Sequence, residues 1–174
     1  MKYFVCIIPP QPVFGELSKI INDLSVENQS PIFFPHLTVL GNVDRELSDI
    51  KKAVETVAKN IESFYLSLGQ VSFGTTYFQS VLVKVELSAQ ISNLNLELKK
   101  LLNMDDNVFT PHISLMYGNQ SIETRENIAK KTIIQSKGFD VAGLAIVPDK
   151  PNPEEWEPIA NISFGKVAPG TLID

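Results

Sequence analysis

The sequence is short of cysteine and of positive charge, and each scarcity excludes a class of protein. A lone Cys6 can form neither an internal disulfide nor a zinc site built from several cysteines. The 174 residues carry 15 Lys and Arg against 20 Asp and Glu, which gives a net charge of −5. Because an acidic chain repels a phosphate backbone, it is a poor non-specific binder of long nucleic acid, although a local pocket could still hold a small nucleotide.

Long hydrophobic runs are also missing. No apolar run reaches the roughly 18–20 residues that a membrane helix needs. The run Phe4–Ile8 stops at Pro9-Pro10 and lacks the basic start and cleavage site of a signal peptide, so we expect a strand of a cytoplasmic protein without a membrane partner. With 44% hydrophobic and 20% charged residues, the chain is expected to fold as an ordinary globular protein.

Strand-like and helix-like stretches alternate along the chain. Apolar residues at helical spacing predict helices over about 13–25, from Leu47 to Ile61, from Ser88 to Leu102 and over about 121–135. Asp44 and Ser88 are the expected N-caps of the second and third of these helices. Compact or alternating apolar runs predict strands at 3–8, 36–40, 64–73, 77–87, 112–117, 139–147 and 159–167, and the proline-rich stretch 148–158 is expected to be a loop.

A seven-residue pattern occurs twice and uses both histidines of the chain. Residues 33–39 read Phe-Phe-Pro-His-Leu-Thr-Val, and residues 109–115 read Phe-Thr-Pro-His-Ile-Ser-Leu. The flanking elements repeat as well, which predicts two copies of β-α-β-α-β, at about 1–73 and 76–147, followed by a closing strand at about 159–167. We therefore expect a single α+β domain over 1–174, with two lobes related by an approximate two-fold axis and one histidine motif in each.

The spacing within the motif predicts a pair of polar groups in each lobe. On a strand, residues i and i+2 share a face about 6.5–7 Å apart, so His36 lies beside Thr38 and His112 beside Ser114. If the two-fold axis passes between these strands, two imidazoles and two hydroxyls face one another across a cleft. Such an arrangement suits in-line displacement at phosphorus without a metal or cofactor. A neutral imidazole acts as base, a charged one as acid, and the hydroxyls bind the phosphate oxygens.

Simpler explanations of the motif are weaker. One His-x-Thr triplet arises often by chance, and a lone strand histidine is usually structural. A duplicated fold has to preserve apolar periodicity but has no need to keep a histidine and a hydroxyl on a shared face, so the doubled pattern favours catalysis. A metal site is disfavoured because two histidines lack a third firm ligand, and catalytic zinc usually has three.

The motifs Pro35-His36-Leu37-Thr38-Val39 and Pro111-His112-Ile113-Ser114-Leu115 resemble the paired signatures of the 2H phosphoesterase superfamily. Within it, the chain is most similar to the cyclic phosphodiesterases of plants and yeast. Further support comes from the stretches at 3–10, 77–81, 114–118 and 156–160, so the resemblance spans nearly the whole chain.

The resemblance implies a bilobal fold with two antiparallel sheets around a central groove, and hydrolysis of a ribose cyclic phosphate. The substrate would be ADP-ribose 1'',2''-cyclic phosphate or a nucleoside 2',3'-cyclic phosphate. His36 and His112 would be the catalytic pair, and Thr38 and Ser114 would hold the phosphate. The family often carries a tryptophan in the first strand where this chain has Cys6. This departure points to a substrate that differs in the part carrying the leaving oxygen.

Four aromatic residues are the further candidates for substrate binding. Tyr117 falls where the family places a site tyrosine, although a regular strand would point it away from His112, so a bulge or strand end has to turn it into the groove. Phe34, Phe78 and Trp156 could stack on a base, or could belong to the core.

Two other functions remain open on this sequence. One is cleavage of a 2'-5' or 3'-5' bond in an oligonucleotide, with a short RNA end as partner, which the acidic charge disfavours. The other is a nucleotide-binding module without catalysis, which would have no need of two titratable groups. We expect a monomer with a small cyclic-phosphate nucleotide as its substrate.

Overall fold

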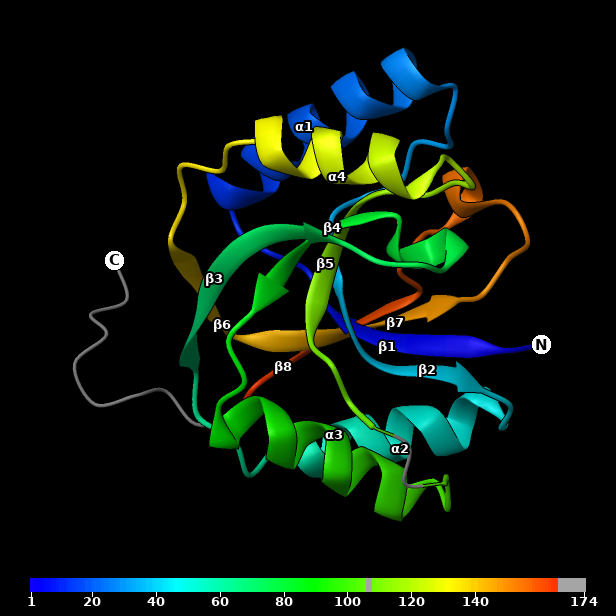
Figure 1. Cartoon of the computed structure of the whole chain (residues 1–174). Helices are drawn as coiled ribbons and strands as arrows, with labels where there is room; N and C mark the ends of the chain where they lie inside the picture. Colours follow the sequence, from blue (N-terminus) through cyan, green and yellow to red (C-terminus); the bar gives the residue numbers. More distant parts are fainter. Residues whose placement is uncertain (106–107, 166–174) are drawn as a thin grey trace.

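The computed structural model describes residues 1–105 and 108–165, which form one sheet flanked by helices on two sides (Figure 1). The strand order is β6-β3-β4-β5-β2-β1-β7-β8, and all neighbours are antiparallel. The strands are β1 (Tyr3–Ile7), β2 (Leu37–Val43), β3 (Phe64–Phe73), β4 (Val81–Val85), β5 (His112–Met116), β6 (Gly138–Val141), β7 (Gly143–Pro148) and β8 (Ala160–Ser163). The helices are α1 (Val13–Asn28), α2 (Leu47–Ala58), α3 (Ala89–Leu101) and α4 (Ile122–Lys131), with short 3-10 turns η1 (Tyr77–Gln79) and η2 (Pro153–Glu155).

The two histidine motifs meet in the middle of this sheet. β2 and β5 are neighbours, but only Leu37 and Ile113 are in register between them, whereas the other neighbours share several pairs. The sheet therefore consists of two antiparallel halves, β6-β3-β4-β5 and β2-β1-β7-β8, joined at one point. This arrangement confirms the predicted α+β class, with the two predicted antiparallel sheets joined into one, and it brings the two motif strands together.

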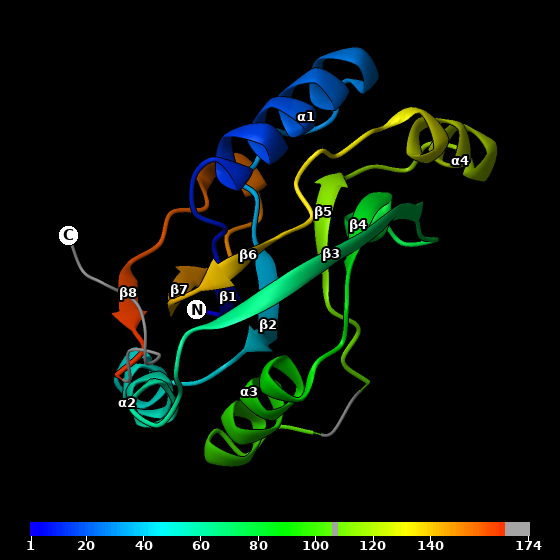
Figure 2. The ribbon, with the colours of Figure 1, turned by 90° about the vertical axis from the view of Figure 1, so that its left-hand side faces the viewer.

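Each half-sheet is covered by one helix from each of the two sequence repeats. α1 contacts β5 and α4 contacts β3 and β4, while α2 and α3 pack on each other and on β2, β7 and β8. Figures 1 and 2 show α1 and α4 on one side of the sheet and α2 beside α3 on the other. Strand β3 of the first sequence repeat also lies between β4 and β6 of the second. Neither repeat can bury its apolar surface without the other, so the elements pack as one unit.

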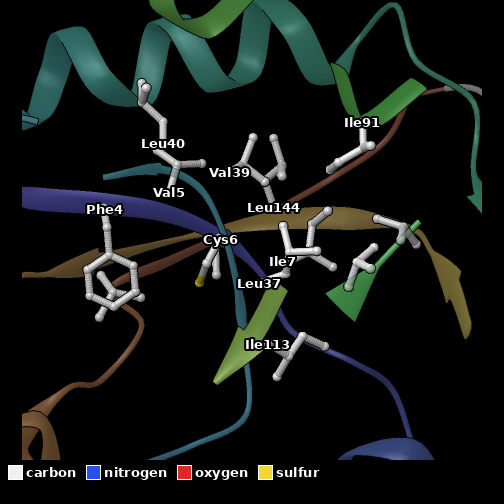
Figure 3. Close-up of a cluster of buried hydrophobic side chains, with 14 of the residues drawn as sticks. Phe4, Val5, Cys6, Ile7, Leu37, Val39, Leu40, Ile91, Ile113 and Leu144 are labelled. Carbon is white, nitrogen blue, oxygen red and sulfur yellow. The ribbon is translucent and has the colours of Figure 1, made fainter. Parts of the chain in front are cut away.

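The core lies under the junction of β1, β2 and β5. Apolar side chains from these strands, from β7 and from α3 are packed together and almost completely buried, among them Val5, Leu37, Ile91, Ile113 and Leu144 (Figure 3). Each such side chain contributes about 1.5–3 kcal/mol on burial, so the backbone beneath the two motifs is held firmly. Cys6 belongs to this core and is fully buried.

The predicted strand at 139–147 is wrong, because two strands occupy these residues. β6 pairs with β3, while β7 pairs with β1 and β8, so the chain changes half-sheets at Ala142. The next residue, Gly143, lies against β8 so closely that a Cβ there would be 2.6 Å from the carbonyl oxygen of Ile162. A continuous apolar run carries no sign of such a change, because both strands bury the same kinds of residue.

Other element boundaries differ at their ends. The strand predicted at 77–87 starts only at Val81, since Tyr77–Gln79 form η1. Ser88 caps α3 as predicted, accepting a hydrogen bond from the Ile91 N–H, whereas the N-cap of α2 is Glu46 and not Asp44. The predicted closing strand ends at Ser163, and its last two residues, 166–167, lie outside the described part of the chain.

No helix in the described part is both long and apolar enough to cross a bilayer.

Candidate active site

A cavity of about 190 Å³ opens where β2 and β5 meet. Seven of the side chains predicted for the site line it, including both histidines and both motif hydroxyls. The full lining is Phe4, His36, Thr38, Gly41, Asn42, Phe78, His112, Ser114, Tyr117, Asp149 and Trp156. The duplicated motif thus contributes its polar side chains from two strands to one small space.

Both imidazoles are held in the same way by the backbone. Nδ1 of His36 lies 2.8 Å from the carbonyl oxygen of Phe34, and Nδ1 of His112 lies 2.8 Å from that of Thr110. Because a carbonyl oxygen can only accept, Nδ1 carries the hydrogen in each ring. Nε2 is left for the cavity, as an acceptor when the ring is neutral and as a donor when it is charged.

His36 is enclosed by aromatic rings and is only 6% exposed. Its ring centroid lies 4.8 Å from Phe34, 5.2 Å from Phe4 and 5.7 Å from Trp156. This burial lowers the pKa of His36 to about 4. The hydrogen bond to the Phe34 carbonyl raises the pKa and so opposes the shift, whereas the charge of His112 lowers it further. An imidazole with the ordinary pKa near 6.5 is partly charged at pH 7, whereas His36 is neutral there.

His112 has a different environment. It is half-buried at the first residue of β5, and no aromatic ring in the described chain packs on it. Its cross-strand partner is Lys84 of β4, which is exposed and does not line the cavity. A charged imidazole is therefore less costly at His112 than at His36, since water reaches it.

The two motif hydroxyls differ in what they already bind. Ser114 Oγ donates a hydrogen bond of 2.8 Å to the carbonyl oxygen of Phe78. Thr38 has no hydrogen-bond partner for its hydroxyl within residues 1–105 and 108–165. Thr38 is free to donate to a ligand, whereas Ser114 has to give up its bond to Phe78 first.

Tyr117 reaches the cavity because β5 ends one residue before it. Its ring stacks on Phe33 with centroids 3.8 Å apart and is nearly completely buried. Burial raises the pKa of the Tyr117 phenol well above its ordinary value, hydrogen bonding with Ser114 opposes this, and the nearby Asp149 carboxylate adds to it. Tyr117 is therefore a neutral donor at any physiological pH.

The other three predicted aromatic residues have different places. Phe78 is 53% exposed at the rim of the cavity. Trp156 follows η2 and is nearly buried in the cavity wall, where its Nε1–H donates to the carbonyl oxygen of Lys150 at 2.8 Å. Phe34 is not part of the lining and instead supports the ring of His36.

Four lining residues were missed by the sequence analysis: Phe4, Gly41, Asn42 and Asp149. The first strand is apolar throughout, so nothing in the sequence distinguishes Phe4, which faces the cavity, from the buried Cys6. Asn42 has a left-handed backbone with φ of 56°, and asparagine tolerates that conformation better than most residues, which is the one signal it offers. Asp149 lies in the loop after β7, and a loop has no periodic pattern from which the position of a charged residue could be predicted.

A buried arginine connects the two segments that bring aromatic residues to the second half of the site. The Arg125 guanidinium donates to the carbonyl oxygens of Gly74, Thr76, Gly118 and Gln120, at 2.8–3.1 Å. It thereby ties the turn that precedes Phe78 to the loop that follows Tyr117. Sequence periodicity predicted the helix that carries Arg125 but gave no sign of these partners.

A metal ion in a protein is usually held by three or more His, Cys, Asp or Glu side chains. No group of three or more His, Cys, Asp or Glu side chains able to hold a metal lies together among the described residues. The polar side chains that the cavity offers to a ligand are two imidazoles, three hydroxyls, one amide and one carboxylate.

Comparison with known proteins places this geometry in a family. Residues 1–164 match the family of cyclic phosphodiesterase-like proteins. The chain is 24% identical over 139 residues to a cyclic phosphodiesterase of Arabidopsis thaliana, covering 79% of this chain and 77% of that protein. It is 23% identical over 147 residues to a putative phosphoesterase of Oceanobacillus iheyensis, covering 81% and 83%.

Solved structures share the fold. TT0787 of Thermus thermophilus superposes with a TM-score of 0.71 at 18% identity, covering 95% of this chain and 98% of that one. E. coli LigT, in a crystal structure with 3'-AMP, superposes with a TM-score of 0.60 at 15% identity over the same shares. The chain therefore belongs to the cyclic phosphodiesterase-like family within the 2H phosphoesterase superfamily, and it is a phosphodiesterase.

Proposed function

We propose that the chain hydrolyses a ribose cyclic phosphate, either a nucleoside 2',3'-cyclic phosphate or ADP-ribose 1'',2''-cyclic phosphate, without a metal. The observation that carries the proposal is the pair of imidazoles on one cavity, each with Nδ1 fixed by a carbonyl two residues earlier. Two nitrogens presented in this way can serve the two proton transfers that displacement at phosphorus requires.

The unequal burial of the histidines suggests which one does what. His36, neutral at pH 7, would take a proton from the attacking water through Nε2. The water oxygen forms a bond to phosphorus, and the bond from phosphorus to one ribose oxygen breaks. That oxygen would take its proton from the charged His112. The product is a ribose phosphomonoester, and the second turnover needs only the return of the proton from His36 to His112 through solvent.

The remaining side chains suit the charge that builds up on phosphate. Thr38 can donate to a non-bridging oxygen at once, and Ser114 can do so after leaving the Phe78 carbonyl. Such donors act where charge develops in the transition state and need little rearrangement there. Phe78 and Trp156 offer apolar faces to a base or sugar at the mouth of the cavity.

A panel assay tests the proposal. Purified protein is incubated with 2',3'-cyclic mononucleotides, ADP-ribose 1'',2''-cyclic phosphate and a short 2'-5' linked oligonucleotide, in chelator, and the products are identified. We expect hydrolysis of at least one cyclic phosphate and unchanged rates in chelator. His112→Ala should lose about 10²–10⁴-fold in activity. Asp140→Asn, which changes an exposed carboxylate of β6 outside the cavity, should be fully active. Activity on the oligonucleotide alone, or activity lost in chelator and restored by a divalent metal, would overturn the proposal.

A further inference from the structure

In the part of the chain that the structure describes, neither lysine nor arginine lines the active-site cavity to bind phosphate. The neutral donors of the cavity are Thr38, Asn42, Ser114 and Tyr117. Sites that hold phosphate groups of multiple charge commonly use arginine or lysine, because two or more negative charges need fixed positive charge nearby. Neutral hydroxyls and one charged imidazole are enough for a single negative charge.

The lining has one fixed charge of its own, and that charge is negative. Asp149 follows β7, and its backbone N–H is fixed to the carbonyl oxygen of Lys2 at 2.9 Å. Its side chain is exposed at the mouth of the cavity, near enough to Tyr117 for its charge to act on the phenol. A second phosphate group entering by this mouth would meet the carboxylate.

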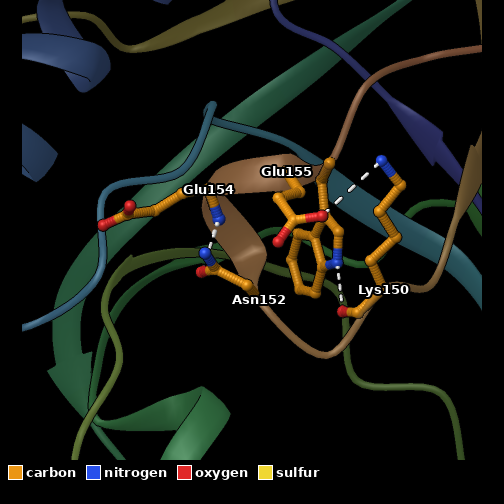
Figure 4. Close-up of polar contacts among 5 residues, drawn as sticks. Lys150, Asn152, Glu154 and Glu155 are labelled. Atoms are coloured by element: carbon orange, nitrogen blue, oxygen red, sulfur yellow. Dashed lines mark hydrogen bonds and ion pairs between the residues drawn. The ribbon is translucent and has the colours of Figure 1, made fainter.

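Neighbouring cations do not cancel Asp149. Within the described residues Asp149 has no ion pair, and the next residue, Lys150, points its ammonium group to Glu155 at 3.8 Å (Figure 4). Lys84, on the strand beside His112, is exposed to water and outside the lining. The field at the mouth is therefore set by a carboxylate, and at ordinary ionic strength it extends about 8 Å.

We propose that this site selects a cyclic phosphodiester whose only negative charge is the reacting phosphate, and that Asp149 is the specificity-determining residue that rejects substrates with additional phosphate groups. The proposal rests on the proposed function, and it names the substrate class: nucleoside 2',3'-cyclic phosphates with an unphosphorylated 5' end, and not ADP-ribose 1'',2''-cyclic phosphate, whose diphosphate adds two charges. Asp149 can also bind such a substrate, because its carboxylate can accept a hydrogen bond from a hydroxyl or amino group of the uncharged nucleoside.

The same charge favours release of product. Hydrolysis converts a singly charged diester into a monoester that carries up to two charges. The added charge forms close to Asp149, inside a cavity that no lysine or arginine of the described residues lines, so the product is held less well than the substrate. Turnover gains from this difference, since a site that bound the monoester tightly would be inhibited by it.

The test compares two ligands that differ in one phosphate. Uridine 2',3'-cyclic phosphate and its 5'-phosphorylated counterpart are offered to the wild type, to Asp149→Asn and to the control Asp140→Asn. Both kcat/KM and binding are measured, the latter by the fluorescence of Trp156, which is the single tryptophan of the chain and lines the cavity. Calorimetry replaces fluorescence if the signal does not change.

We expect the wild type to prefer the unphosphorylated ligand by about tenfold or more. Asp149→Asn should reduce this preference roughly three- to tenfold, through better use of the 5'-phosphorylated ligand, and added salt should reduce it as well, because the repulsion is screened. Asp140→Asn should retain the wild-type preference. Equal use of both ligands by the wild type, or an unchanged preference in Asp149→Asn, overturns the inference. If neither ligand nor any other cyclic phosphate of the panel is hydrolysed, the proposed function fails, while the binding ratio still decides the charge selectivity.

Discussion

The halves of the site around His36 and His112 are built from the same sequence motif and yet differ in their surroundings. In both, a carbonyl two residues before the histidine holds Nδ1 at 2.8 Å. Around His36, however, Phe4 and Trp156 complete an apolar enclosure, whereas His112 is half open to water. The motif accounts for the orientation of the rings, and the surroundings account for the difference in burial.

One of the aromatic residues that enclose His36 belongs to its motif copy, since Phe34 stands where the second copy has Thr110, and the others, Phe4 and Trp156, come from outside the motif copies. Phe4 belongs to the first strand, and Trp156 belongs to the loop after β7, which has no counterpart in the repeat. A duplicated fold begins with two equivalent imidazoles, and two equivalent imidazoles do not divide the roles of base and acid between them. Enclosure of one ring by additional aromatic side chains is a simple way to make it the neutral partner.

The largest effect should follow from removing either imidazole. His36→Ala and His112→Ala should each reduce kcat by about 10²–10⁴-fold, the usual range for one acid–base group. The double variant should be little worse than either single one, because both act in the same step. Steady-state rates with a cyclic mononucleotide measure this, with thermal unfolding as a check that each variant is folded. Losses that multiply fully in the double variant would contradict concerted action.

The next effect separates the two hydroxyls. Thr38→Val should reduce kcat/KM by about ten- to a hundredfold, because the Thr38 hydroxyl is free to donate to a charged oxygen. Ser114→Ala should cost only about three- to tenfold, since its hydroxyl has to leave the Phe78 carbonyl before it binds phosphate. Parallel kinetics on the two variants decide the point. A larger loss in Ser114→Ala would show that the Ser114 bond to Phe78 is not what limits its contribution.

Much of this could be predicted from the sequence because the signals are local. Periodicity locates the four helices, and the repeated motif identifies the two histidines and two hydroxyls that share the cavity. The exchange of helices between half-sheets could not be predicted, because α1 presents the same apolar stripe whether it covers β2 or β5. The division into β6 and β7 was hidden for the same reason, since only hydrogen-bond partners distinguish them.

The unequal pair of histidines could not be predicted either. His36 and His112 lie in the same motif and, among the three residues before each histidine, only Phe34 in place of Thr110 differs, so the sequence does not show how deeply one ring is buried. The burial of His36 depends on Phe4 and Trp156, which lie 32 and 120 residues away in the sequence and meet it only after folding. Asp149 was missed on similar grounds, because a single acidic residue in a proline-rich loop is indistinguishable from a solvated one.

A pH profile tests the contrast between the two histidines. With a pKa of about 4 for His36, kcat/KM should fall less than about twofold from pH 7 to pH 5, whereas an ordinary pKa of 6.5 would cost roughly 25-fold. Phe34→Ala opens the ring to water and should move the acid limb to higher pH. Phe78→Ala, which contacts Tyr117 and not His36, is the matched control and should leave the limb in place. An acid limb near pH 6.5 in the wild type would contradict the assignment of His36 as the buried base.

The smallest effect concerns stability. Burial lowers the pKa of His36 from 6.5 to about 4 in the folded state, so the unfolded chain takes up a proton more readily between these values. Stability is therefore lost as pH falls from about 6.5 towards 4, by about 1–2 kcal/mol between pH 7 and pH 5. Urea unfolding at the two pH values measures this loss. In His36→Gln the contribution disappears and the difference should shrink by that amount, whereas His112→Gln should retain it. Equal slopes in the two variants would mean that the aromatic enclosure does not exclude the proton from His36, and the division of roles between the two histidines would then need another cause.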